Sequence, residues 1–242
     1  MDGRQRLAGL EDTALCIYRY RCLRWYSRSL KEASSDADNE RIQTEMNTGR
    51  VEALTDGLLA IIITVMVFDI TVTSGDRLSD LLALWPVLLS FALSFIYIAI
   101  YWNNHSYLLS ACRKLTPAVM WGNMHLLFWL SLIPFTTRWV GSHPFAPVPS
   151  AIYGVVLLMA ALAYFYLQTR ILAQHAHDHP LRHAFRADWK RKTSMGLYAA
   201  GIGLAFLQPV FSWLLYAAVA MLWFVPDPRI ARALHDHQET DA

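Results

Sequence analysis

Long apolar stretches separated by short polar segments make up most of this chain. Four stretches contain no Asp, Glu, Lys or Arg, and they cover residues 81–112, 115–137, 139–169 and 193–226. An α-helix rises about 1.5 Å per residue, so about 20 residues cross a hydrocarbon core of about 30 Å. Each stretch is therefore long enough to form at least one membrane-spanning helix.

Two further features set the number of spans. The stretch 193–226 would measure about 51 Å as one helix, and Gln208-Pro209 lies near its middle. Because proline tends to end the preceding helix, we expect a hairpin of two short helices over 193–208 and 210–226. Residues 50–73 add another largely apolar span, so the pattern predicts six transmembrane helices.

The positions of Lys and Arg test this count. The connections at 74–80, 140–149 and Gln208-Pro209 contain almost none, with Arg77 inside the first and Arg138 at the edge of the second. The opposite side carries most of the basic residues, namely Arg50, Arg113, Lys114, Arg170, Arg182, Arg186, Lys190, Arg191, Lys192, Arg229 and Arg232. Positive residues concentrate on the cytoplasmic side of membrane proteins. The predicted fold is therefore all-α and polytopic, with six spans and both termini cytoplasmic.

Composition supports a membrane protein and excludes several other classes. Hydrophobic residues make up 55% of the 242 positions and charged residues 17%, against about 25% charged in ordinary soluble domains. The net charge of +2 gives no indication of nucleic-acid binding. We find no nucleotide-binding loop, HExxH, GxSxG or kinase signature, so we expect neither an enzyme nor a cofactor.

The chain divides into three parts by composition. Residues 1–45 are rich in Arg and polar residues, and they form either an amphipathic basic helix on anionic lipid or a poorly ordered extension upstream of the natural start. Residues 46–230 form the six-helix transmembrane domain. Residues 231–242 form a polar C-terminal tail.

Polar residues gather near the cytoplasmic ends of three predicted helices. They are Arg50, Thr55, Asp56, Trp102, His105, Asn123 and His125. Charged and polar groups at such depth need partners, because an unpaired polar group in a membrane is costly. The cluster is either a structural clamp that fixes the register of the helices, or a proton relay or ion-coordinating site. We favour the clamp, because one Arg, one Asp and two His define no recognisable metal geometry.

A histidine-rich run, HAHDHPLRH, occupies residues 175–183. Such runs bind metal in some proteins. In a cytoplasmic connection, however, a solvated linker is the more common structure. We therefore predict no metal site in this chain.

The segment RVEALTDG resembles the Arg-x-x-x-Phe-Ser-Asp signature of the transmembrane protein 175 family, with Leu54 and Thr55 replacing Phe and Ser. Trp102-x-x-His105 resembles the Trp-x-x-His-His motif of that family, with Ser106 in place of the second His. Asn123 through the SLIPF segment at 131–135, and Pro226-Asp227, are also similar. The resemblance covers about residues 46–230.

The resemblance implies a homotetramer of six-helix subunits in which the first helices line a central pore. The family lacks a Thr-Val-Gly-Tyr-Gly filter, and its pore is narrowed by apolar side chains of the first helix. By this resemblance the pore constriction consists of Ile61, Thr64 and Phe68. At 100° per residue, the neighbouring pore-lining positions are Leu54, Val65 and Val72. Without the family, the same stripe would be read as a surface for lipid or helix packing.

The resemblance thus implies a potassium-permeable channel in a bacterial cytoplasmic membrane. Its partners would be potassium ions, the lipid bilayer and copies of itself. The alternative is a proton-coupled secondary transporter that uses Asp56, His105 and His125. The sequence has no evident internal repeat or midplane charge of the kind common in transporters.

Overall fold

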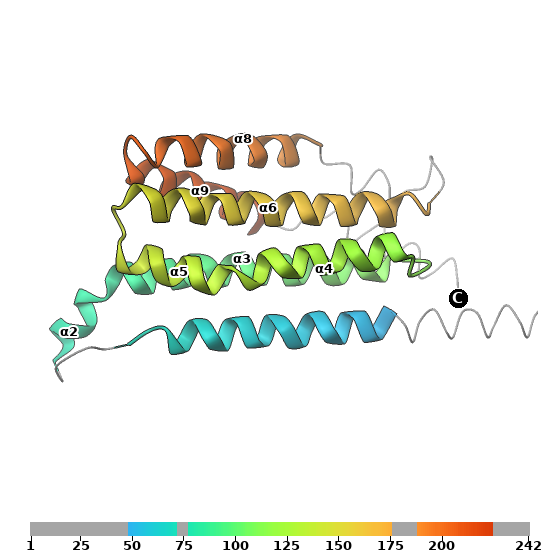
Figure 1. Ribbon diagram of the computed structural model, residues 1–242, viewed down its shortest axis with the longest axis horizontal. Helices are drawn as coiled ribbons and strands as arrows, with labels where there is room; N and C mark the ends of the chain where they lie inside the picture. The colour runs from blue at the N-terminus through green and yellow to red at the C-terminus, as the bar shows by residue number, and fades with distance from the viewer. Residues whose placement is uncertain (1–47, 72–76, 176–187, 225–242) are drawn as a thin grey trace, which may run out of the picture. The chain divides into compact units, whose positions relative to one another are not determined.

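The computed structural model describes residues 48–71, 77–175 and 188–224, and all regular structure in these ranges is helical. The first helix, Thr48–Phe68, is the blue and cyan ribbon in Figure 1. The helices that follow are α2 (Leu78–Ala83), α3 (Trp85–Ser110), α4 (Pro117–Ser131), α5 (Ile133–Ser142), α6 (Pro147–Leu172), α8 (Asp188–Leu204) and α9 (Pro209–Phe224). The predicted all-α class is therefore confirmed.

Four helical segments are long and apolar enough to cross a membrane. They are the first helix, α3, the segment Pro117–Ser142 formed by α4 and α5, and α6. Helix α9 is apolar but shorter, and α8 has 17 residues. The helix break predicted at Gln208-Pro209 is observed, since α8 ends at Leu204 and α9 begins at Pro209.

Two predicted connections differ from those observed. The connection expected at 74–80 contains the start of α2 at Leu78, and α3 begins only at Trp85, where Pro86 occupies the first turn that tolerates proline. The connection expected at 140–149 is shortened, because α5 continues to Ser142 and α6 begins at Pro147. Arg138 therefore lies within a helix, where its side chain is paired with Asp69.

The first helix, α3, the segment formed by α4 and α5, α6, α8 and α9 run in alternating directions. Figure 1 shows the α5–α6 and α8–α9 turns at the end where α2 lies, and the α3–α4 turn at the other end. At that other end the side chain of Gln174 holds the α3–α4 turn. Its Oε1 accepts from the backbone N–H groups of Arg113 and Lys114, and its Nε2 donates to the Lys114 carbonyl. Burial in this turn raises the pKa of the Cys112 thiol.

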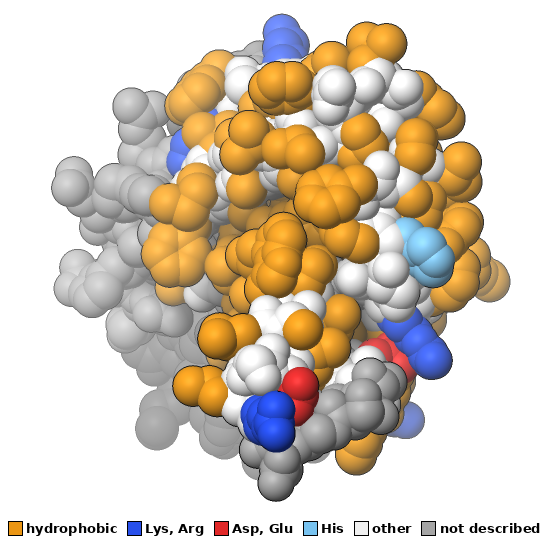
Figure 2. All heavy atoms as spheres, turned by 90° about the vertical axis from the view of Figure 1, so that its left-hand side faces the viewer, with side chains coloured by type: hydrophobic (Ala, Val, Ile, Leu, Met, Phe, Trp, Pro, Cys, Tyr) orange, Lys and Arg blue, Asp and Glu red, His pale blue; other side chains and the backbone are white. Residues whose placement is uncertain are grey.

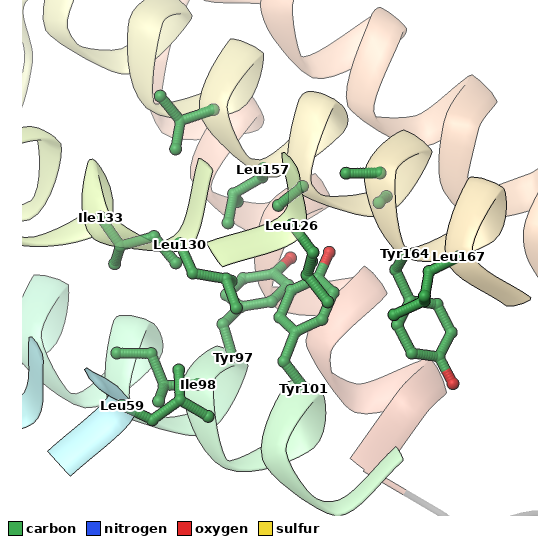
Figure 3. Close-up of a cluster of buried hydrophobic side chains, with 14 of the residues drawn as sticks. Leu59, Tyr97, Ile98, Tyr101, Leu126, Leu130, Ile133, Leu157, Tyr164 and Leu167 are labelled. Atoms are coloured by element: carbon green, nitrogen blue, oxygen red, sulfur yellow. The ribbon is translucent and has the colours of Figure 1, made fainter. Parts of the chain in front are cut away.

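A continuous core of buried aliphatic and aromatic side chains joins these helices. The members labelled in Figure 3 come from the first helix, α3, α4, α5 and α6, and they are Leu59, Tyr97, Ile98, Tyr101, Leu126, Leu130, Ile133, Leu157, Tyr164 and Leu167. Tyr216 of α9 is also fully buried, and its ring lies against Gly154 of α6 and Gly201 of α8. These two glycines leave the space that the ring occupies.

The predicted segments 1–45 and 231–242 lie outside the described residues, as do the histidines of the 175–183 run other than His175.

Candidate functional site

The first helix presents two different faces. One face is buried against the rest of the chain, and its residues follow helical spacing: Val51, Thr55, Leu59, Ile62 and Met66. The predicted constriction lies on another face. Ile61 is 59% exposed and Phe68 81% exposed, and Thr64 is also exposed. The chain's own helices therefore pack against one side of the first helix and leave the predicted pore side uncovered.

Two of the remaining predicted pore positions are also exposed. Leu54 and Val65 are exposed, whereas Val72 lies outside the described residues. The Thr64 hydroxyl donates to the Ile61 carbonyl at 2.8 Å. Because this bond uses the hydroxyl hydrogen, the Thr64 oxygen keeps its lone pairs available as an acceptor.

Three of the predicted polar residues form a buried chain of hydrogen bonds between helices. His105 of α3 donates from Nε2 to Oδ1 of Asn123 of α4 at 2.7 Å. The Asn123 Nδ2 donates to the Thr55 hydroxyl of the first helix at 3.3 Å, and Thr55 donates in turn to the Val51 carbonyl at 2.9 Å. All three side chains are buried, and Asn123 is fully inaccessible. Asn123 thus links the first helix to α3 and α4 through both ends of its amide.

Two acidic residues of the first helix also bind α3. Trp102 donates from its indole Nε1 to Oδ1 of Asp56 at 2.9 Å. Ser106 donates to Oε1 of Glu52 at 2.8 Å. The prediction included Asp56 and Trp102 but missed the Glu52–Ser106 contact. The spacing of Glu52 and Asp56, four residues apart on one helix face, was the signal that could have found it.

Two predicted members lie apart from this network. His125 accepts from Nε1 of Trp129, four residues along α4, at 2.9 Å. Asn123 and His125 are two residues apart, so their side chains project about 200° from one another around the helix and cannot reach the same neighbours. Arg50 is exposed, and within 48–71, 77–175 and 188–224 the structure gives it no hydrogen bond or ion pair. The network in the described part of the chain therefore consists of hydrogen bonds that join the first helix, α3 and α4.

We expect Asn123→Leu to lower the free energy of unfolding by about 1–2 kcal/mol, the range found for hydrogen bonds between membrane helices. The substitution removes the amide, so Thr55 loses a donor and the buried His105 nitrogen is left unpaired. Detergent-titrated unfolding of the purified protein measures the loss. His125→Leu is the matched control, because it changes an exposed position two residues away. Equal stability of the two variants would contradict the clamp.

Among the residues that the structure describes, no group of three or more His, Cys, Asp or Glu side chains is arranged to hold a metal ion. His175 is the one member of the histidine-rich run among these residues, and it is buried.

The helical architecture and the apolar spans define the class: this is a multi-pass α-helical membrane protein. The sequence model of the family described as "Endosomal/lysosomal potassium channel TMEM175" matches residues 50–134. This range contains the first helix from Arg50 and both helices that bind it through Asn123 and His105. The chain belongs to the TMEM175 family.

Similar proteins are found in several bacteria. A protein named "Potassium channel" from Chryseobacterium sp. is 40% identical over 192 residues, which cover 79% of this chain and all of the relative. Another protein named "Potassium channel", from Chamaesiphon minutus, is 33% identical over 180 residues, covering 68% of this chain and 87% of the relative.

A solved structure has the same fold. It is described as the crystal structure of a lysosomal potassium-selective channel TMEM175 homologue from Chamaesiphon minutus. The TM-score is 0.63 at 29% identity, and the similarity covers 74% of this chain and 96% of the other.

Proposed function

We propose that this protein is a potassium-permeable channel of a bacterial cell membrane. In the proposed assembly, four copies surround one axis and the first helix of each copy lines the pore. Ions pass down their gradient without catalysis, cofactor or coupled substrate. The observation that carries this proposal is the uncovered face of the first helix, in a chain whose relatives are named potassium channels.

The uncovered face supports an oligomer. Ile61, Thr64 and Phe68 lie on successive turns of this face, and the first helix is packed against its own chain on a different side. A pore lined by these residues therefore requires further copies of the chain. Six spans with both termini cytoplasmic would place the Arg50 end of the first helix inside the cell.

The proposed constriction uses two kinds of side chain. A narrow ring of Ile61 side chains would hold little water and would gate ion flow by dewetting. A ring of Thr64 hydroxyl oxygens one turn away would offer acceptors to a partly dehydrated potassium ion. The hydrogen-bonded network around Asn123 would hold this pore helix against α3 and α4 while ions pass.

The proton-coupled transporter is the competing function. It requires Asp56, His105 and His125 to exchange protons with one another. Trp129 occupies Nε2 of His125, whereas Asn123 occupies Nε2 of His105, which gives the three groups no shared hydrogen bond. This arrangement favours the channel.

Potassium-loaded liposomes containing the purified full chain separate the two functions. A channel releases potassium down its gradient when a protonophore lets protons enter to compensate the charge. The rate of this release depends on no coupled substrate. A carrier instead gives saturable exchange that stops when the proton gradient is removed. Native mass spectrometry of the same preparation tests for four copies, and a fully active single copy would overturn the proposal.

A further inference from the structure

An ion pair joins α5 to the end of the first helix that lies away from the Asn123 network, and its arginine side chain is 69% exposed and its aspartate 23% exposed. Arg138 of α5 donates from Nη1 to Oδ1 of Asp69 at 3.1 Å. Asp69 comes directly after Phe68, the last residue of the first helix. A carboxylate at a helix C-terminus is repelled by the unpaired carbonyl groups there, so this position needs a compensating cation. Arg138 supplies that cation from a residue 69 positions away in the chain.

A cavity lies beside this ion pair. It has a volume of about 200 Å³ and is partly open to the surface, and it is lined by residues from the end of the first helix, α3 and α5, among them Met66, Asp69, Phe91, Thr137 and Arg138. Figure 2 views this end of the molecule, where the described side chains are mostly hydrophobic and charged ones are few. Side chains in a filled core would hold a helix end by contact alone. Here a cavity replaces part of those contacts. The Asp69–Arg138 ion pair joins the end of the first helix to α5 beside this cavity.

Asp69 and Phe68 project in different directions from the helix. Successive residues are rotated by about 100°, so when Asp69 reaches back to α5, the Phe68 ring points away from the rest of the chain. The 81% exposure of Phe68 agrees with this geometry. Phe68 and Asp69 are consecutive residues, so the position of the ion pair constrains the position of the Phe68 ring, the outermost ring of the proposed constriction.

We propose that Asp69 and Arg138 form a positioning pair that holds Phe68 back from the pore axis. This inference rests on the proposed channel function. Without the pair, the chain beyond the buried Met66 loses its charged contact with α5 and is free to move. The exposed phenyl rings of the four copies then gather at the axis, because contact removes their apolar surface from water. The pore narrows at this ring, and each open channel carries less current.

Single-channel recording in planar bilayers tests the pair. We expect Asp69→Asn and Arg138→Gln each to lower the single-channel current about threefold or more, through narrowing of an apolar ring. The exchanged variant Asp69→Arg with Arg138→Asp is expected to recover most of the current. Asp80→Asn is the matched control, because Asp80 binds the backbone of Arg77 beside its own helix α2. Unchanged current in both single variants would overturn the pair's role.

A second background shows whether the pair acts through Phe68. In Phe68→Ala channels the large ring is absent, so adding Asp69→Asn is expected to change the current by less than about 1.5-fold. A loss as large as that in the unaltered background would instead assign Asp69 a general structural role and overturn the inference. Where a neutral variant fails to assemble, Asp69→Glu and Arg138→Lys take its place. These keep both charges, so near-normal current is expected, and a loss in both as large as that expected from the neutral variants would contradict an ion pair.

Failure of the channel function and failure of the pair's role give different recordings. Absence of channel current from the unaltered protein overturns the proposed function, and the pair's role with it. Normal current from the unaltered protein together with normal current from Asp69→Asn and Arg138→Gln overturns only the pair's role.

Discussion

Replacement of Ile61 by Asn is expected to raise potassium flux through the reconstituted protein by about tenfold or more. In the proposed tetramer this change places four amide groups where four apolar side chains meet. Water then remains in the constriction, and an ion no longer has to pass a dry ring. A tenfold change in rate corresponds to about 1.4 kcal/mol in the barrier, a modest fraction of the cost of desolvating an ion. Stopped-flow measurement of potassium release from liposomes gives the rate directly.

Val67→Asn is the matched control for this prediction. Val67 is exposed on the same helix, but its side chain projects about 120° from that of Ile61 around the helix axis. The control therefore adds the same polar group outside the proposed pore and should leave the flux unchanged. Ile61→Val should also change the flux little, because it preserves an apolar ring. Equal flux from Ile61→Asn and Val67→Asn would show that Ile61 does not face the conduction path.

Two glycines of α8 are expected to respond in opposite directions to the same substitution. A Cβ atom added at Gly201 would lie too close to the buried ring of Tyr216, whereas one added at Gly203 meets no atom within 4 Å. Gly201→Ala should therefore lower the free energy of unfolding by about 1–3 kcal/mol through overpacking. Gly203→Ala should raise it by up to about 1 kcal/mol, because Ala favours the helix more than Gly does.

Unfolding of the two variants in parallel detergent titrations measures this difference. Each variant is the control for the other, since both change one glycine to alanine in the same helix. The Tyr216 ring also lies against Gly154 of α6, so displacing it would disturb the packing of α6, α8 and α9 together. Equal stability of Gly201→Ala and Gly203→Ala would mean that the ring moves aside at no cost.

Hydrophobic patterning predicted the helical class and the approximate positions of the helices. The prediction succeeded because a helix satisfies its own backbone hydrogen bonds, so a long apolar segment in lipid needs no distant partner to form one. Helix ends were predicted less accurately than helix positions. The charge of Arg138 predicted the end of a span there, but α5 continues past it to Ser142, and Asp69 pairs with that charge.

The members of the polar cluster were predicted only in part. Depth along each helix was readable from sequence, and it correctly brought together Thr55, His105 and Asn123. Direction around each helix was not considered together with depth. His125 has the right depth, but it projects to another side of α4 and binds Trp129. The contact of Ser106 with Glu52 was missed because Glu52 was not grouped with the cluster, although it lies one turn from Asp56 on the same helix.

The sequence by itself determined that this protein is an α-helical membrane protein with the TMEM175 signature at the start of its first helix. Those properties depend on local composition and on short motifs, which are complete within one segment of chain. Only the tertiary structure decided which side of the first helix is buried and which is exposed, because this helix is apolar on nearly every side and its own pattern selects none. The same holds for the Asp69–Arg138 pair and for the space around Tyr216. Each joins residues far apart in sequence, and their contact arises only when the helices pack.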